Sequence, residues 1–137
     1  MIYGGKNMKN LKSFKNKYQF TTIEDDGCYM SEEAKKFARE FKSALSNELK
    51  KDTNCEITKF QIGHYDLFAF VYNRDTQKYC YIDYSIPRWG EYVDLDNRGC
   101  LKGFLVRTAK NDNDYTGGSN HFANITELKN LIVKLVA

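Results

Sequence analysis

The sequence contains four cysteines but no C-x-x-C pair, and it has only two histidines. The cysteines are far apart in the chain and have no evident histidine partner, so we expect free thiols rather than disulfides or a zinc site. No apolar run approaches the ~20 residues of a membrane-spanning helix. The N-terminus also lacks the apolar segment of a signal peptide. These absences predict a cytoplasmic protein that needs neither a cofactor nor a membrane.

The charge of the chain is concentrated at one end. The first 18 residues contain no acidic side chain but five lysines, namely Lys6, Lys9, Lys12, Lys15 and Lys17. The rest of the chain holds 16 basic and 18 acidic side chains, so the net charge of +3 comes from a basic arm on a near-neutral body. We predict a single domain of 137 residues that carries this arm at 1–18.

The basic arm has two interpretations. A basic amphipathic segment can dock on phosphate or on an acidic partner. Alternatively, the arm forms a helix or strand that rests on the body with its lysines in water. The spacing of Leu11, Phe14 and Tyr18 matches one face of a helix and is compatible with both interpretations.

Three consecutive runs are rich in aromatic and β-branched residues, as strands prefer. These runs are 55–62, 67–72 and 79–86. The second run is apolar on both faces, so we expect it to be the central strand of a sheet. Residues 104–108 predict a fourth strand, and the shorter segments 18–23 and 93–95 are further strand candidates.

Two amphipathic helices are predicted, at 31–50 and 124–136. In the first helix, Ser31 is a suitable N-cap, and apolar residues recur at the spacings of one helical face. The second helix begins at Asn124, which has the spacing of a capping box with Glu127. We therefore predict an α+β fold, in which an antiparallel meander of four to five strands carries both helices on one face.

The segment 107–121 is long, polar and glycine-bearing, and it lies between a predicted strand and a predicted helix. Its candidate binding residues are Arg107, Lys110, Tyr115, Gly117, Gly118, Ser119 and Asn120. Backbone N–H groups around the glycines could surround an anion. The spacing of Asp112, Asp114 and Thr116 resembles the start of a calcium loop, although Ala123 stands where such a loop needs a glutamate. A long turn capped by its own Asp and Asn side chains explains the same residues.

One constellation in this segment could carry chemistry. His121 lies near Asp114 and Arg107 in the sequence, and a histidine beside a carboxylate can act in general acid–base catalysis. A small metal-free nuclease or phosphotransfer enzyme could be assembled from these parts. Proximity in the sequence is not geometry, however, and the spacing matches no known motif. We therefore favour a protein without catalysis.

The face of the sheet opposite the two helices must be covered by the arm or by a partner. Tyr72, Tyr79, Tyr81 and Tyr92 are candidates for that face, because tyrosine combines a large apolar body with a polar tip. Trp89, the only tryptophan, is either an interface anchor or a loop aromatic that folds onto the body.

The leading hypothesis is a small non-enzymatic binding protein with a macromolecular partner. An inhibitor of a nucleic-acid-handling machine, encoded by a phage or mobile element as anti-CRISPR proteins are, fits the size of the chain. The alternative is an accessory protein that binds nucleic acid directly through the lysine-rich arm.

Overall fold

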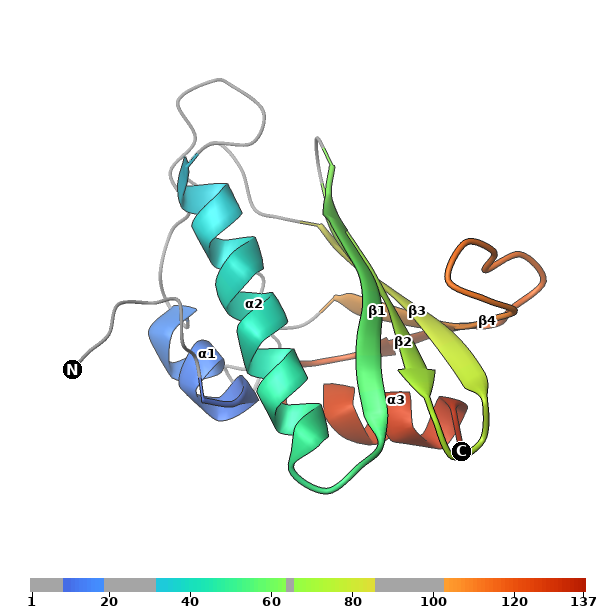
Figure 1. Cartoon of the computed structure of the whole chain (residues 1–137). Helices are drawn as coiled ribbons and strands as arrows, with labels where there is room; N and C mark the ends of the chain where they lie inside the picture. The colour runs from blue at the N-terminus through green and yellow to red at the C-terminus, as the bar shows by residue number, and fades with distance from the viewer. Residues whose placement is uncertain (1–8, 19–31, 64–65, 86–102) are drawn as a thin grey trace.

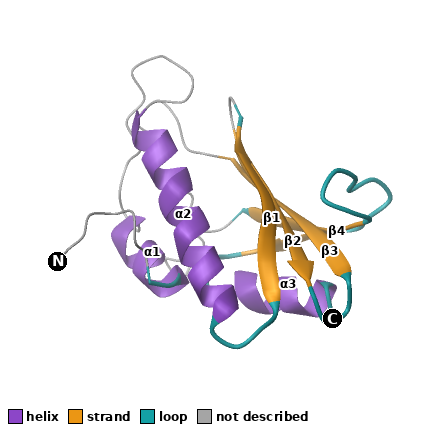
Figure 2. Ribbon diagram, viewed as in Figure 1, coloured by secondary structure: helices purple, strands orange, loops and turns teal. Residues whose placement is uncertain are grey.

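The computed structural model describes residues 9–18, 32–63, 66–85 and 103–137, and these residues form three helices and one five-stranded sheet. The helices are α1 (Leu11–Tyr18), α2 (Glu32–Lys50) and α3 (Leu128–Leu135). The strands are β1 (Cys55–Ile62), β2 (Asp66–Asn73), β3 (Lys78–Ser85), β4 (Phe104–Ala109) and β5 (Asn120–Ala123). The predicted α+β fold is confirmed (Figure 1, Figure 2).

The sheet is an antiparallel meander whose strands lie side by side in chain order, β1-β2-β3-β4-β5. The first four strands lie where the sequence predicts them. The sequence also predicts β2 at the centre, but β3 holds that place, because β5 adds a strand beyond β4. The short polar sequence of β5, NHFA, lacks the apolar alternation that reveals a strand.

Helices α2 and α3 pack on one face of the sheet, as predicted, and we call this the helix side. Their apolar side chains form one core with those of the strands. The core includes Phe37, Phe41, Leu45, Leu49, Leu128 and Ile132 from the helices, Ile125 from the turn before α3, and Leu67, Val71, Cys80, Ile82, Phe104 and Val106 from the strands. Burial of this apolar surface is the main term that stabilises the fold.

Helix α3 is shorter than the helix predicted at 124–136. The side chain of Asn124 does accept a hydrogen bond from the backbone N–H of Glu127, at 2.9 Å. This bond closes a turn, however, and the helix begins only at Leu128. An Asn followed three residues later by a bonded N–H is typical of both a turn and a helix N-cap, so the sequence predicts the contact but misplaces the first helical residue.

Helix α1 shows that the described part of the basic arm rests on the body. Leu11, Phe14 and Tyr18 are buried, as the spacing predicts, and the ring of Phe14 lies 5.1 Å from that of Phe37 on α2. The carboxylate of Glu40, also on α2, is buried and accepts hydrogen bonds from the side chains of Tyr18 and Lys17. Figure 1 shows α1 on the side of α2 away from the strands.

Several predictions from the sequence lie outside the described residues. They concern Lys6, Ser31, Trp89, Tyr92, Cys28, Cys100 and the strand candidates 19–23 and 93–95. Tyr18, which the sequence places at the start of a strand, instead ends α1. The other two cysteines, Cys55 and Cys80, are buried free thiols.

In the described part of the chain, no helix combines the length and the apolar character needed to cross a membrane.

Candidate binding face of the sheet

The face of the sheet opposite the helix side, here called the outer face, carries two rows of side chains that run across all five strands. Residues directly opposite each other on neighbouring antiparallel strands point to the same face. The pairing register defines a Tyr81 row, made of Lys59, Phe70, Tyr81, Arg107 and Asn120. It also defines a Phe68 row, made of Gln61, Phe68, Asp83, Leu105 and Phe122.

The Tyr81 row is covered by Tyr115 from the loop 110–119 that joins β4 to β5. The rings of Tyr115 and Tyr81 are stacked, with centroids 4.1 Å apart and planes inclined by 10°. Phe70 lies 5.2 Å from Tyr81 and completes an aromatic cluster. The guanidinium of Arg107 lies 5.6 Å from the centre of the Tyr115 ring, a cation–π distance. In Figure 1 this loop, drawn in orange, lies on the side of the strands away from α2.

The loop is held to the sheet by polar contacts as well. Arg107 Nε donates a hydrogen bond to the carbonyl of Gly118 at 3.0 Å, and Lys59 Nζ donates one to Asn113 Oδ1 at 2.5 Å. Within the loop, Asp114 Oδ1 accepts hydrogen bonds from the backbone N–H and the hydroxyl of Thr116. These bonds lower the pKa of Asp114. The loop is therefore an ordered turn built by its own side chains.

The two glycines of this loop have conformational and steric roles. Gly117 has a φ of 80°, which other residues adopt only with strain. A Cβ atom at Gly118 would lie 2.3 Å from the backbone oxygen of Thr108, so only glycine allows the loop to approach β4 this closely. Because Arg107 Nε is already bonded to Gly118, the turn interpretation accounts for these residues. The interpretation as an anion site stays a prediction.

The Phe68 row has a carboxyl group at its centre, that of Asp83, and the Asp66 carboxyl lies next to it. Asp83 lies opposite both Phe68 and Leu105, and its Oδ2 accepts a hydrogen bond from the Tyr81 hydroxyl at 2.7 Å. Burial, and then a hydrogen bond with the Asp66 carboxyl, raise the pKa of Asp83 to about 6. A hydrogen bond between two carboxyls requires one of them to be protonated, so this bond forms only while Asp83 carries its proton.

The Phe68 row is more accessible than the Tyr81 row. Phe122, on the edge strand of the Phe68 row, keeps 69% of its surface exposed. Tyr115, in the loop that covers the Tyr81 row, keeps 38%. These two are the large apolar side chains that are exposed in the described part of the chain. Phe68 and Leu105 are half-buried, whereas Phe70 and Tyr81 are buried beneath the loop.

The structure does not bring the three catalytic candidates together. His121 lies opposite Val106, a core residue, and is therefore on the helix side of the sheet. Arg107 is on the outer face, and Asp114 is in the loop. Among the described residues, no three His, Cys, Asp or Glu side chains are placed to hold a metal ion.

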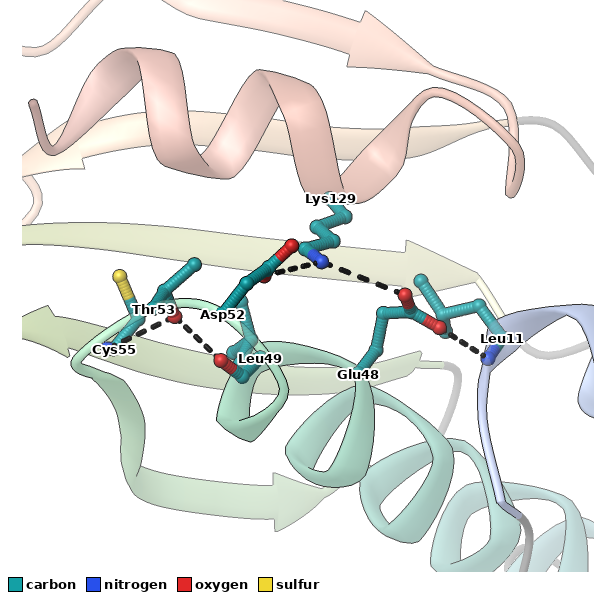
Figure 3. Close-up of polar contacts among 7 residues, drawn as sticks. All are labelled: Leu11, Glu48, Leu49, Asp52, Thr53, Cys55 and Lys129. Carbon is teal, nitrogen blue, oxygen red and sulfur yellow. Dashed lines mark hydrogen bonds and ion pairs between the residues drawn. The ribbon is translucent and has the colours of Figure 1, made fainter.

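Helix α1, which carries Lys12, Lys15 and Lys17, lies on the opposite side of the molecule from the loop 110–119 (Figure 1). Lys12 and Lys15 line a groove of about 500 Å³ between α1, α2 and the start of α3. Lys129 also lines it, but its amine is held by Asp52 at 2.6 Å and Glu48 at 3.5 Å. Figure 3 shows Glu48 between Lys129 and the backbone N–H of Leu11, which donates to it at 3.2 Å. This junction of three helices is a structural contact.

The main residues that sequence reasoning misses are Phe68, Asp83, Leu105 and Phe122. Phe68 could have been found, because it alternates with the core residues of a strand that is apolar on both faces. Asp83 carries a weaker signal, as the single acid of a strand rich in apolar and aromatic residues. Phe122 carries no such signal, because the sequence does not predict its strand.

Comparisons with protein-family models, with curated proteins and with solved structures found no match to this chain.

Proposed function

We propose that this chain is a small binding protein without catalytic activity, and that it engages a protein partner through the outer face of the sheet. One observation carries the proposal: Phe122 keeps 69% of its surface exposed, directly opposite the half-buried Leu105 on the same face of the sheet. Aromatic residues and arginine dominate the energetics of protein interfaces. An exposed aromatic group on a sheet face that no described helix covers is therefore a candidate interface.

The loop 110–119 supports the proposal because it is ordered before any partner binds. The stack of Tyr115 on Tyr81 and the bond from Arg107 to Gly118 fix the position of the exposed aromatic ring. Side chains that are already fixed lose less conformational entropy on binding, which favours affinity. Tyr115 is thus suited to be an anchor at such an interface.

The specific form of this proposal is an inhibitor of a nucleic-acid-handling machine, of the kind that phages and mobile elements encode against CRISPR systems. Such an inhibitor acts by occupying a surface of its target and needs no catalytic residues of its own. The outer face supports this form of the proposal because its aromatic side chains lie near both acidic and basic ones.

Affinity capture from bacterial lysate with matched variants tests the proposal. The test variant is Phe122→Ser with Tyr115→Ser, and the control is Lys36→Ser with Lys50→Ser, which changes exposed residues of α2. We expect the wild type and the control to recover the same protein, and the test variant to recover about thirtyfold less, because two anchors that each contribute more than ~1 kcal/mol of binding free energy are lost. Circular dichroism should show that both variants fold. Equal recovery by all three proteins would reject the outer face as the interface.

A second candidate function, direct binding of nucleic acid, is favoured by the groove beside α1. Lys12 and Lys15 line this groove, and Lys9 is exposed just before the helix. If these three lysines contact duplex phosphates, the logarithm of the binding constant should fall with that of salt concentration at a slope of about −2.7. Replacing all three by glutamine should abolish that slope. Absence of binding at low salt would exclude this candidate.

A further inference from the structure

We infer that the partner of the outer face presents a basic side chain, flanked by apolar side chains, to the Phe68 row. This inference rests on the proposed function and names the chemistry of the surface that the partner brings. It is carried by the position of the Asp83 carboxyl between Phe68 and Leu105, and by the contacts that already engage Arg107 and Lys59 on the outer face.

The apolar part of the Phe68 row surrounds a negative charge. Asp83 is directly opposite Phe68 on one side and Leu105 on the other, and Leu105 is opposite Phe122. Side chains in such pairs have Cβ atoms about 4.5–5.5 Å apart, so they form one continuous strip. A partner that packs on Phe122 and Leu105 must therefore also meet the carboxyl of Asp83.

No described lysine or arginine neutralises this carboxyl pair. Arg107, the cation of β4, lies over the Tyr115 ring and donates a hydrogen bond to the Gly118 carbonyl. Lys59, the cation of β1, donates a hydrogen bond to the Asn113 side chain. Among the described residues, the Tyr81 hydroxyl donates a hydrogen bond to Asp83. Covering a carboxylate with an apolar surface is costly unless an opposite charge comes with it. The outer face thus favours a partner that supplies a cation.

The rings and alkyl groups around the pair suit an arginine or lysine side chain. The aliphatic part of such a side chain can pack on Leu105, while its charged end reaches Asp83. The ring of Phe68, directly opposite Asp83, offers a face for a cation–π contact. A peptide in which basic and apolar residues alternate would place its side chains along the strip, because extended chains alternate their faces.

Binding of a cation should be linked to the loss of the Asp83 proton. Burial and Asp66 raise the pKa of Asp83 to about 6 in the free protein, and a bound cation would favour the ionised form. At pH 5 the partner must displace a proton, whereas at pH 7.5 Asp83 is already ionised. Affinity should therefore rise about tenfold between these two values.

Selection of random twelve-residue peptides on the immobilised wild-type protein provides the probe. We expect selected peptides to be enriched in arginine or lysine next to apolar residues. The tightest peptide is then measured by fluorescence anisotropy against the wild type, Asp66→Asn with Asp83→Asn, and the control Glu32→Gln with Glu33→Gln. The control makes the same change of charge at exposed residues of α2. We expect a loss of affinity of tenfold or more in the first variant only, together with loss of the pH dependence.

The outcomes separate this inference from the proposed function. Peptides without basic residues, or peptides that bind the Asp66→Asn, Asp83→Asn variant as tightly as the wild type, would overturn the inference. If the same peptides lose affinity with Phe122→Ser, the outer face remains the binding surface and only its predicted preference for a cation is wrong. Binding that is unchanged by Phe122→Ser as well would reject both. Failure to select any peptide would also overturn the inference.

Discussion

The helix side and the outer face of the sheet are built from alternate residues of the same strands, yet they are closed in different ways. On the helix side, α2 and α3 bury aromatic rings completely, and Phe41 and Phe104 have no exposed surface. On the outer face, one loop covers the Tyr81 row, and Phe122 in the Phe68 row stays 69% exposed. The comparison teaches that the aromatic content of a sheet face does not reveal whether the face is buried or exposed, because the elements that cover it decide its exposure.

The largest difference between the faces should appear in stability. Phe41 is fully buried, with ring centroids of Phe14 and Phe104 at 5.6 Å and 5.3 Å. Phe41→Ala should lower the free energy of unfolding by about 3–5 kcal/mol, because it leaves a cavity that the neighbouring rings cannot fill. Urea denaturation measures this. A loss below about 1 kcal/mol would mean that the helix side is not closed as described.

The loop that covers the Tyr81 row should be the next most sensitive element. Gly118→Ala places a Cβ atom 2.3 Å from the Thr108 carbonyl oxygen, so the loop must move away from β4. We expect a loss of about 1–3 kcal/mol in stability and faster hydrogen exchange across residues 110–119. The neighbouring control Ser119→Ala, at an exposed position, should change stability by less than about 0.5 kcal/mol. Equal effects of the two changes would contradict the close contact.

The carboxyl pair should make the outer face sensitive to pH. Burial and Asp66 raise the pKa of Asp83 from 3.8 to about 6, so the folded state favours the protonated acid. The stabilising effect of that proton is complete below pH 3.8 and is lost as the pH rises through 6. Asp83→Asn should therefore raise stability at pH 7.5, by on the order of 1 kcal/mol, and have little effect near pH 3.5. Unfolding curves at both pH values measure this. A larger gain in stability at pH 3.5 than at pH 7.5 would contradict the raised pKa of Asp83.

The smallest effect on stability should come from the most exposed aromatic residue. Phe122→Ala removes a ring that is largely in water, so the free energy of unfolding should change by less than about 0.5 kcal/mol. Urea denaturation, run in parallel with Phe41→Ala, provides the comparison. A loss above about 2 kcal/mol would show that Phe122 belongs to a core, and its role as an interface residue would then have to be abandoned.

Much of the fold could be predicted from the sequence, because strands β1 to β4 and helix α2 have strong and regular patterns. The amphipathic spacing of Leu11, Phe14 and Tyr18 also predicted the buried face of α1. The first residue of α3 and the existence of β5 could not be predicted. In both cases short polar segments acquire their structure from tertiary pairing, which local propensity does not reveal.

The candidate site could be predicted only in part. Tyr115, Gly117 and Gly118 were identified as unusual, but their role depends on a stack and a close contact that join the loop to β3 and β4. The Phe68 row exists only because the pairing register aligns five residues from five strands. Such alignment is a property of the folded sheet, and no single segment of the sequence contains it.

The most direct test of the central claim is to map where a selected peptide binds. Backbone amide chemical shifts of the labelled protein should be recorded during titration with the tightest peptide. We predict that the largest changes fall on β3, β4 and β5, at Asp83, Leu105 and Phe122, and on Tyr115 in the loop. Changes confined to Lys12, Lys15 and Lys129, around the groove between the helices, would contradict the claim that the outer face is the binding surface.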